Sequence, residues 1–239
     1  TPAKCLPILY PLWFLSVRKR SQTFRKKTKK RKIAYNAYAQ KIYCDYFFDL
    51  TKTIYLSKVV WTNYILGVIK QLQDNGFSFD GFNCVFSSNI PVGSGLSSSA
   101  ALECGTIFGI KELFGLSIPK VDIALMGQKA EHWVGINCGI MDQFSSVMGL
   151  ENKVIKIDCR TLDYEYHEAN FNEYSLILFD SNVKHSLMTS AYNERRLQCE
   201  EGIAILKNNF PEISSFRDCT KNQVLSLKDK MSENVFKRS

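Results

Sequence analysis

The chain has 239 residues, of which 45% are hydrophobic and 23% charged, and its formal net charge is +8. This apolar fraction is typical of a packed core and excludes a disordered chain. The length suits one large domain or two small ones. The positive charge does not cover a whole surface, because ten basic residues fall in one short segment: Arg18, Lys19, Arg20, Arg25, Lys26, Lys27, Lys29, Lys30, Arg31 and Lys32.

A charge run of this kind usually lies on a solvated loop or hairpin. Phe24 is the only aromatic residue within this basic segment, and no nucleic-acid-binding module is recognisable. We therefore expect no nucleic-acid partner. The apolar stretch Leu6 to Val17 is too short to span a bilayer, so we predict a buried strand there and no membrane partner. The eight cysteines form no Cys-x-x-Cys pair, which favours reduced thiols in the cytoplasm over a structural zinc.

Strands are predicted first and helices after them. In chain order we expect two or three strands with a basic hairpin up to about Leu56, an amphipathic helix over 60–73, a strand over 82–86, helices over 98–114 and 120–133, strands over 154–158 and 175–180, and a long helix over 191–208. Strands with helices packed against them predict a two-layer α+β fold.

The most informative segment runs from Pro91 to Glu103 and reads Pro-Val-Gly-Ser-Gly-Leu-Ser-Ser-Ser-Ala-Ala-Leu-Glu. Two glycines, two residues apart, allow a tight turn and a close backbone approach to a ligand. The hydroxyls and helix formers that follow predict a helix N-terminus, where free N–H groups and the helix dipole favour an anion. We therefore predict a phosphate-binding loop. It is neither a Walker A loop nor a Rossmann fingerprint, since the Gly-Lys-Ser/Thr run and the third glycine are missing.

This segment resembles the ATP-binding motif of the GHMP small-molecule kinases. Further stretches resemble galactokinases in particular: Trp61 to Val68, Ala130 to His132, Cys138 to Phe144, Ile157 to Leu162, Asp180 to Leu187 and Ser190 to Arg196. The resemblance implies a ribosomal protein S5 domain 2-like, ATP-binding N-terminal domain over 1–165, and the start of the GHMP kinase C-terminal domain over 166–239. It also implies ATP and Mg²⁺ as cofactors, galactose as substrate and a monomeric parent protein.

The resemblance assigns roles residue by residue. The nucleotide-binding positions are Gly93, Ser94, Gly95, Leu96, Ser97, Ser98 and Ser99, with Trp61 near the adenine. Ser99 and Glu131 correspond to the magnesium ligands, and Asp142 to the catalytic aspartate. Gly139, Asp142 and Tyr192 correspond to sugar-contacting positions. Phosphoryl transfer needs mainly positioning, charge neutralisation and a carboxylate at the attacking hydroxyl, which this set would supply.

Each assignment has a structural alternative. Asp142 could be a helix N-cap or a surface acid, Glu131 a solvated helix residue, Tyr192 a packing residue and Trp61 a core residue. The spacing from Glu131 to Asp142 is one residue shorter than in galactokinases, around Trp133. Because one helical residue turns a side chain by about 100°, we expect either Glu131 or the helix end to be displaced.

Two motifs of galactokinases are missing from this chain: the Gly-Glu-His-Thr-Asp-Tyr type sugar motif and the late glycine-rich motif. We therefore expect a chain truncated at both ends, with galactose phosphorylation near background. The predicted activity is transfer of phosphate from ATP to the anomeric hydroxyl of galactose. The alternatives are an N-acetylgalactosamine kinase and a non-catalytic galactose and ATP sensor.

Overall fold

The computed structural model describes residues 4–8, 13–19, 32–39, 42–88, 90, 95–169, 177, 179 and 191–239. The chain divides into two compact units, Thr1–Val183 and Lys184–Ser239. The predicted boundary after residue 165 falls inside a strand of the first unit, β7 (Tyr164–Glu168). No helix in the described part of the chain is long and apolar enough to cross a membrane.

The first unit contains a five-stranded sheet in the order β1-β2-β5-β3-β4. Its strands are β1 (Lys4–Ile8), β2 (Trp13–Lys19), β3 (Lys32–Ala39), β4 (Ile42–Asp49) and β5 (Phe82–Ser88). Neighbouring strands are antiparallel except for the parallel pair β3 and β5, where Ala34 lies opposite Asn83. This arrangement places the end of β5, which leads toward the predicted nucleotide loop, in the middle of the sheet.

Three predictions for the N-terminal strands are wrong. Four strands, β1 to β4, precede Leu56, where two or three were expected. The apolar stretch from Leu6 to Val17 is not one strand but parts of β1 and β2, which pair with Leu6 opposite Leu15. A continuous apolar run hides the boundary between two strands when both carry apolar residues. The basic segment does not close a hairpin, because β2 and β3 on either side of it both pair with β5 and not with each other.

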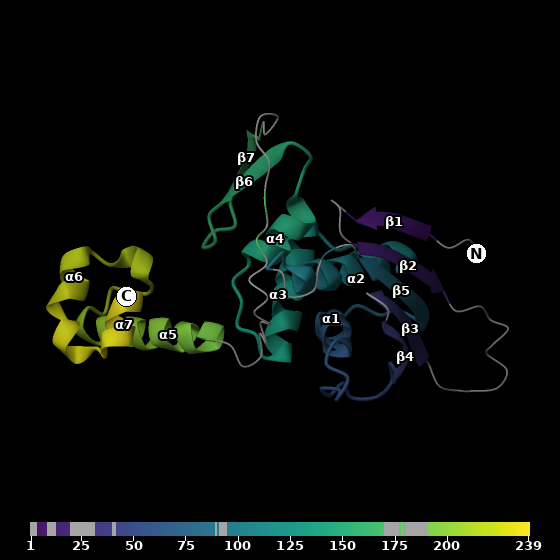
Figure 1. Cartoon of the computed structure of the whole chain (residues 1–239), viewed down its shortest axis with the longest axis horizontal. Helices are drawn as coiled ribbons and strands as arrows, with labels where there is room; N and C mark the ends of the chain where they lie inside the picture. The colour runs from purple at the N-terminus through teal and green to yellow at the C-terminus, as the bar shows by residue number, and fades with distance from the viewer. Residues whose placement is uncertain are drawn as a thin grey trace. The chain divides into compact units, whose positions relative to one another are not determined.

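Helices form the second layer in the described part of the first unit (Figure 1). They are α1 (Thr62–Asp74), α2 (Ser98–Phe114), α3 (Lys120–Val134) and α4 (Met141–Met148). α2 packs against β1 and β2, while α1, α3 and α4 pack around α2. The predicted two-layer α+β fold is therefore confirmed, as are the predicted helices that correspond to α1, α2 and α3.

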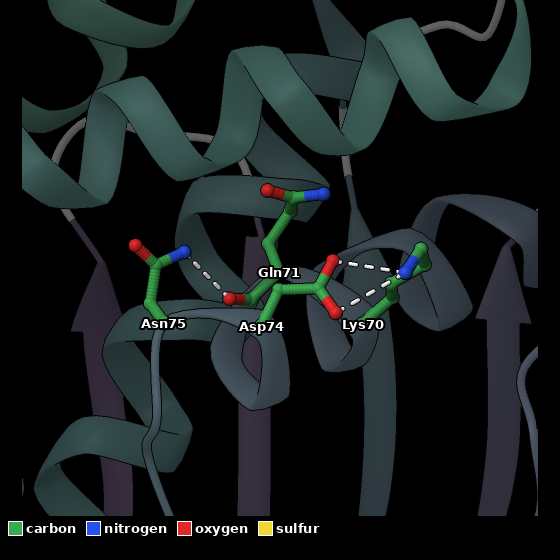
Figure 2. A network of polar contacts seen from close by, with 4 residues as sticks. All are labelled: Lys70, Gln71, Asp74 and Asn75. Atoms are coloured by element: carbon green, nitrogen blue, oxygen red, sulfur yellow. Dashed lines mark hydrogen bonds and ion pairs between the residues drawn. The ribbon is translucent and has the colours of Figure 1, made fainter.

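The apolar spacing of α1 explains its place in the core. Ile65, Ile69 and Leu72 recur on one face and are fully buried. At the C-terminal end, Asn75 donates from its side chain to the carbonyl of Gln71 at 2.8 Å, as Figure 2 shows. The same carbonyl also accepts the backbone N–H of Asn75 at 3.1 Å, so the side chain adds a second hydrogen bond at the end of the helix.

An ion pair supports the same end of α1. Lys70 Nζ lies 2.9 Å from Asp74 Oδ2, one helical turn away. Such partly exposed pairs stabilise a helix by about 0.3–0.5 kcal/mol. The helix is thus held mainly by its buried face and only slightly by its surface charges.

A two-stranded sheet completes the described part of the first unit. β6 (Lys153–Ile157) confirms a predicted strand, and it pairs antiparallel with β7, which the sequence did not predict. Tyr166 of β7 donates to the carbonyl of Met148 at 2.7 Å, which ties the hairpin to the end of α4. The strand predicted over 175–180 lies almost wholly outside the described residues.

The second unit is helical in its described part, with α5 (Ala191–Asn209), α6 (Lys221–Ser226), α7 (Glu233–Arg238) and the short 3-10 turns Phe216–Asp218 and Lys228–Lys230. The long helix predicted over 191–208 is confirmed as α5. The unit has its own small core, made of Leu206, Ile213, Leu227, Met231 and Val235.

Candidate active site

The predicted nucleotide loop enters α2 through two residues with left-handed backbone. Gly95 has φ +78° and Ser97 has φ +55°. Ser97 is the N-cap of α2, and its side chain does not cap the helix. The first N–H groups of α2 therefore lack the usual side-chain acceptor, and a bound anion would suit them. Gly93 and Ser94 lie outside the described residues, and Leu96 is exposed.

The structure brings the two predicted magnesium ligands together. Ser99, in the first turn of α2, donates to Glu131 Oε1 of α3 at 2.7 Å. Glu131 is buried, with only 4% of its surface exposed, so it is not the solvated helix residue of the alternative interpretation. Glu131 is thus within hydrogen-bonding distance of Ser99, and the displacement expected from the spacing to Asp142 remains a prediction.

The other oxygen of Glu131 is held by a buried network. Gln143 Nε2 of α4 lies 2.5 Å from Glu131 Oε2, and Cys138 Sγ lies 3.4 Å from the same atom. Gln143 Nε2 also lies 3.4 Å from Glu103 Oε2 of α2. Glu103 and Gln143 are both fully buried. Three helices thus each contribute a polar side chain to one buried cluster.

Burial and negative charge shift the pKa values of the groups around this cluster. Burial, reinforced by the charge of Glu131, raises the pKa of Glu103 well above 4.5. The hydrogen bond from Gln143 acts in the opposite direction and lowers this pKa, but its effect is smaller. Burial and the charges of Glu131 and Glu103 raise the pKa of Tyr64 to about 12. Burial and Glu131 likewise raise the pKa of the Cys138 thiol. Burial therefore favours the protonated form of Glu103 in the folded chain.

A glycine makes room for the network. A Cβ atom added to Gly127 of α3 would lie 2.9 Å from Cys104 Sγ and 3.2 Å from Gln143 Cγ. Real Cβ atoms essentially never come as close as the first of these distances. Gly127 thus lets α2 and α4 pack directly against α3 beside the site.

The predicted catalytic residue Asp142 lies in the first turn of α4 and is half-buried. The loop before it is pinned to α3, because Gln128 Nε2 donates to the carbonyl of Cys138 at 3.2 Å and His132 Nε2 lies 2.8 Å from the same oxygen. Gly139 in this loop is exposed, with open space where a Cβ would stand. A carboxylate at the N-terminal end of a helix is favoured by the helix dipole.

The remaining predicted residues, Trp61 and Tyr192, lie on two other helices. Trp61 is the N-cap of α1, is half-buried and packs against the main core together with Tyr64. Tyr192 lies on α5 in the second unit and is 44% exposed. Their contacts with adenine and sugar remain predictions.

Sequence reasoning missed Glu103, Gln143 and Gly127. Glu103 follows Ser99 by four residues, which places both side chains on one face of α2, so the helical period could have indicated it. Gln143 follows Asp142 directly, but its burial and its bridging role depend on how α4 packs against α2 and α3. Gly127 carries no local signal, since a glycine inside a helix says nothing about which neighbour it accommodates.

The donor set at Ser99 and Glu131 fits magnesium. Both supply hard oxygen atoms, and Mg²⁺ is usually held by one or two protein oxygens together with phosphates and water. Neighbouring oxygens of an Mg²⁺ octahedron lie about 3 Å apart when the bonds are about 2.1 Å, close to the separation of these two atoms. Among the described residues, no group of three or more His, Cys, Asp or Glu side chains could hold a metal by itself.

Several known proteins are similar to this chain in sequence. Residues 63–150 match the model of the GHMP kinases N terminal domain. The chain is 41% identical over 186 residues to the galactokinase of Thermotoga neapolitana, a match that covers 76% of this chain and 52% of the relative. It is 39% identical over 188 residues to the galactokinase of Clostridium perfringens, with 78% and 48% covered. The chain thus spans about half the length of these relatives.

Solved structures agree with the sequence matches. The structure of Lactococcus lactis galactokinase complexed with galactose superposes with a TM-score of 0.81 at 29% identity, over 95% of this chain and 57% of that one. Methanococcus jannaschii mevalonate kinase shares the fold, with a TM-score of 0.53 at 18% identity over 93% of this chain and 65% of that one.

Residues 63–150 are therefore similar to the N-terminal domain of GHMP kinases, and the chain as a whole is similar to galactokinases. The matched range 63–150 contains α2 to α4, all of α1 except Thr62, and the whole buried cluster around Glu131. The two relatives named above, which share about two fifths of the aligned residues with this chain, are galactokinases.

Proposed function

We propose that this chain is a sugar kinase that transfers the terminal phosphate of ATP to the anomeric hydroxyl of galactose. The observation that carries the proposal is the hydrogen bond of 2.7 Å between Ser99 and Glu131, at the start of the helix that follows the glycine loop. This bond places the proposed magnesium-binding pair, Ser99 and Glu131, beside the proposed phosphate-binding loop. The similarity to galactokinases supports galactose as the acceptor.

In the proposed site the loop and the first turn of α2 bind the triphosphate. The left-handed residues Gly95 and Ser97 turn the chain so that its N–H groups lead into the helix, where they would stabilise the charge that develops during transfer. Ser99 and Glu131 would hold Mg²⁺, which neutralises phosphate charge when it is bound. These groups account for nucleotide binding without a Walker A lysine.

Asp142 orients or deprotonates the attacking hydroxyl in this proposal. Its half-buried position in the first turn of α4 leaves it accessible to a small substrate, and the bonds from Gln128 and His132 to Cys138 hold the loop in front of it. Gly139 and Tyr192 would contact the sugar. The cytoplasm is the proposed location, and a monomer is the proposed state of the parent protein.

The test measures transfer of labelled phosphate from MgATP to galactose, at protein concentrations high enough to detect slow turnover, together with binding of MgATP by calorimetry. Asp142→Asn is expected to reduce transfer by a factor of about 100 or more while MgATP binding is unchanged, since an amide keeps the shape of the side chain but cannot accept the proton.

Three results would contradict this proposal in different ways. Wild-type transfer that survives in Asp142→Asn would remove Asp142 from the mechanism. Binding of both ligands without any transfer would favour the galactose and ATP sensor if a longer chain that carries the two missing galactokinase motifs is equally inactive. Preferential transfer to N-acetylgalactosamine would identify the alternative kinase.

A further inference from the structure

The side-chain amide of Gln143 bridges two carboxyl groups that come from different helices. Its Nε2 atom lies 2.5 Å from Glu131 Oε2 on α3 and 3.4 Å from Glu103 Oε2 on α2. A primary amide carries two N–H donors, so one nitrogen can serve both acceptors. Gln143 is fully buried, and this bridge is therefore shielded from exchange with water.

The bridge leaves the two oxygens of Glu131 with different tasks. Oε2 accepts from Gln143 and Cys138, while Oε1 accepts from Ser99. The terminal torsion of a glutamate is broad, so an unanchored carboxylate turns easily. Anchoring Oε2 in the protein interior keeps Oε1 directed at Ser99.

We propose that Gln143 is a positioning residue for magnesium: it holds Glu131 by Oε2 so that Oε1 faces the metal, and Glu103 anchors the amide. The proposal rests on the proposed function in so far as Ser99 and Glu131 bind the Mg²⁺ of the nucleotide. Gln143 directly follows Asp142, so the first turn of α4 positions the metal carboxylate and also carries the acceptor-orienting aspartate.

The carboxyl group of Glu103 and the amide of Gln143 can anchor each other as an acid–amide pair. Two buried oxygens, Glu103 Oε1 and Gln143 Oε1, have no hydrogen-bond partner within the described residues. These two oxygens belong to the same carboxyl and amide groups in which Gln143 Nε2 already contacts Glu103 Oε2. A carboxylic acid paired with a carboxamide forms two such bonds, one in each direction, because the acid O–H donates to the amide oxygen. Glutamine at position 103 could form a similar pair, whereas an apolar side chain could not.

Packing around Gln143 fits a fixed position. Gly127 of α3 carries no side chain where Gln143 Cγ and Cys104 Sγ lie against the helix. The Gln143 side chain is therefore packed between α2 and α3. Small shifts of α4 would move its amide relative to the carboxyl groups of Glu103 and Glu131. A residue that only fills the core would need neither the bridge nor this clearance.

The experiment compares ATP binding to the full chain in Mg²⁺ and in EDTA by calorimetry. Gln143→Met keeps the volume but removes the amide, and Gln143→Asn keeps the amide but withdraws it by one methylene. Both are expected to weaken MgATP binding by about 10- to 100-fold, as is usual when groups that orient a metal ligand are lost. ATP binding in EDTA should stay unchanged, and Glu103→Gln should bind MgATP like the wild type.

Matched controls separate positioning from stability. Gln71→Met removes another buried helix amide, on α1, and should leave the ratio of the two affinities unchanged. If the Gln143 variants lose affinity equally in Mg²⁺ and in EDTA, or if Glu103→Gln is as damaged as they are, the positioning role is overturned.

A second measurement needs no nucleotide, so it distinguishes failure of this inference from failure of the proposed function. In the metal-free chain, the side-chain ¹⁵N–H₂ signals of Gln143, assigned by their loss in Gln143→Met, should exchange slowly and shift in Glu131→Gln. A wild type that binds no MgATP but shows these signals would refute the proposed function and keep the bridge. Fast exchange without a shift would overturn the bridge itself.

Discussion

At the scale of single residues, the segment that leads into α2 contains two residues with a rare backbone conformation. Gly95 and Ser97 both have φ in the left-handed region, which costs a serine more than it costs a glycine. Ser97 also gives up the side-chain cap that serines at this position usually provide. Such a local cost is common where a loop is shaped for a ligand, and the nucleotide phosphates are the ligand proposed for this loop.

Gly95→Val should abolish ATP binding and leave the fold intact. Nothing lies within 4 Å of a Cβ at this position, so the cost is the left-handed backbone itself, about 1–2 kcal/mol. Valine would move the loop out of the left-handed region and withdraw its N–H groups from the phosphates. Calorimetric titration with ATP and thermal unfolding would measure the two effects.

Gly76→Val is the matched control for this change. Gly76 has φ +81°, also with open space around it, in the turn after α1. It should lose similar stability and keep its affinity for ATP. Unchanged ATP affinity in a folded Gly95→Val variant would show that the loop does not bind the nucleotide.

At the scale of elements, the sequence predicted the long, periodic helices α1, α2, α3 and α5 because their apolar spacing or flanking glycines and prolines mark them. It did not predict α4, whose eight residues are too few for a clear period. It also missed β7, where the strand Tyr-Glu-Tyr-His-Glu is largely exposed and shows no buried apolar face. The sequence motifs pointed to Ser99 and Glu131, which the structure brings into contact, whereas their metal-binding role and the catalytic role of Asp142 remain predictions. The bridge from Gln143 to Glu103 arises only when α2, α3 and α4 pack together.

Gly127→Ala tests that packing. An added methyl would meet Cys104 Sγ and Gln143 Cγ, and overpacking of this kind costs about 1–3 kcal/mol, more than the roughly 1 kcal/mol that alanine gains over glycine in a helix. We expect lower stability together with weaker MgATP binding, measured by denaturant unfolding and calorimetry.

Gly67→Ala is the corresponding control on α1. Its Cβ would lie 2.9 Å from the carbonyl oxygen of Ala130, so it should also destabilise the fold by overpacking. It approaches the backbone of α3 and not Gln143 itself. Equal losses of MgATP affinity in the two variants would mean that helix packing in general, and not the contact with Gln143, limits binding.

At the scale of the whole molecule, two separate apolar cores divide the chain, and the buried carboxyl groups lie within the first unit. All three tryptophans, Trp13, Trp61 and Trp133, also belong to this unit. Tryptophan fluorescence therefore follows unfolding of the unit that contains the site, without a contribution from α5 to α7. This makes the stability of the site measurable apart from that of the second unit.

The stability of the first unit should fall as pH rises above about 4.5 because of Glu103. Burial and the neighbouring Glu131 hold the pKa of Glu103 well above 4.5 in the fold, so the folded chain keeps a proton that the unfolded chain releases. The free energy of unfolding then decreases with pH, by up to about 1.4 kcal/mol per pH unit, until the pH passes the raised pKa. The other titratable groups near the cluster are Tyr64, Cys104 and Cys138.

Glu103→Gln removes this proton while keeping the shape of the side chain. In metal-free buffer between pH 5 and 8 (a range of about three units), urea unfolding followed by tryptophan fluorescence should show the wild type losing stability relative to the variant as pH rises. Glu151→Gln, at an exposed glutamate in the turn before β6, controls for the change in net charge. A difference between wild type and Glu103→Gln that does not change with pH would mean that Glu103 holds no extra proton in the fold. The acid–amide pair with Gln143 would then have to be abandoned, because a carboxylate at position 103 could not donate to the amide oxygen.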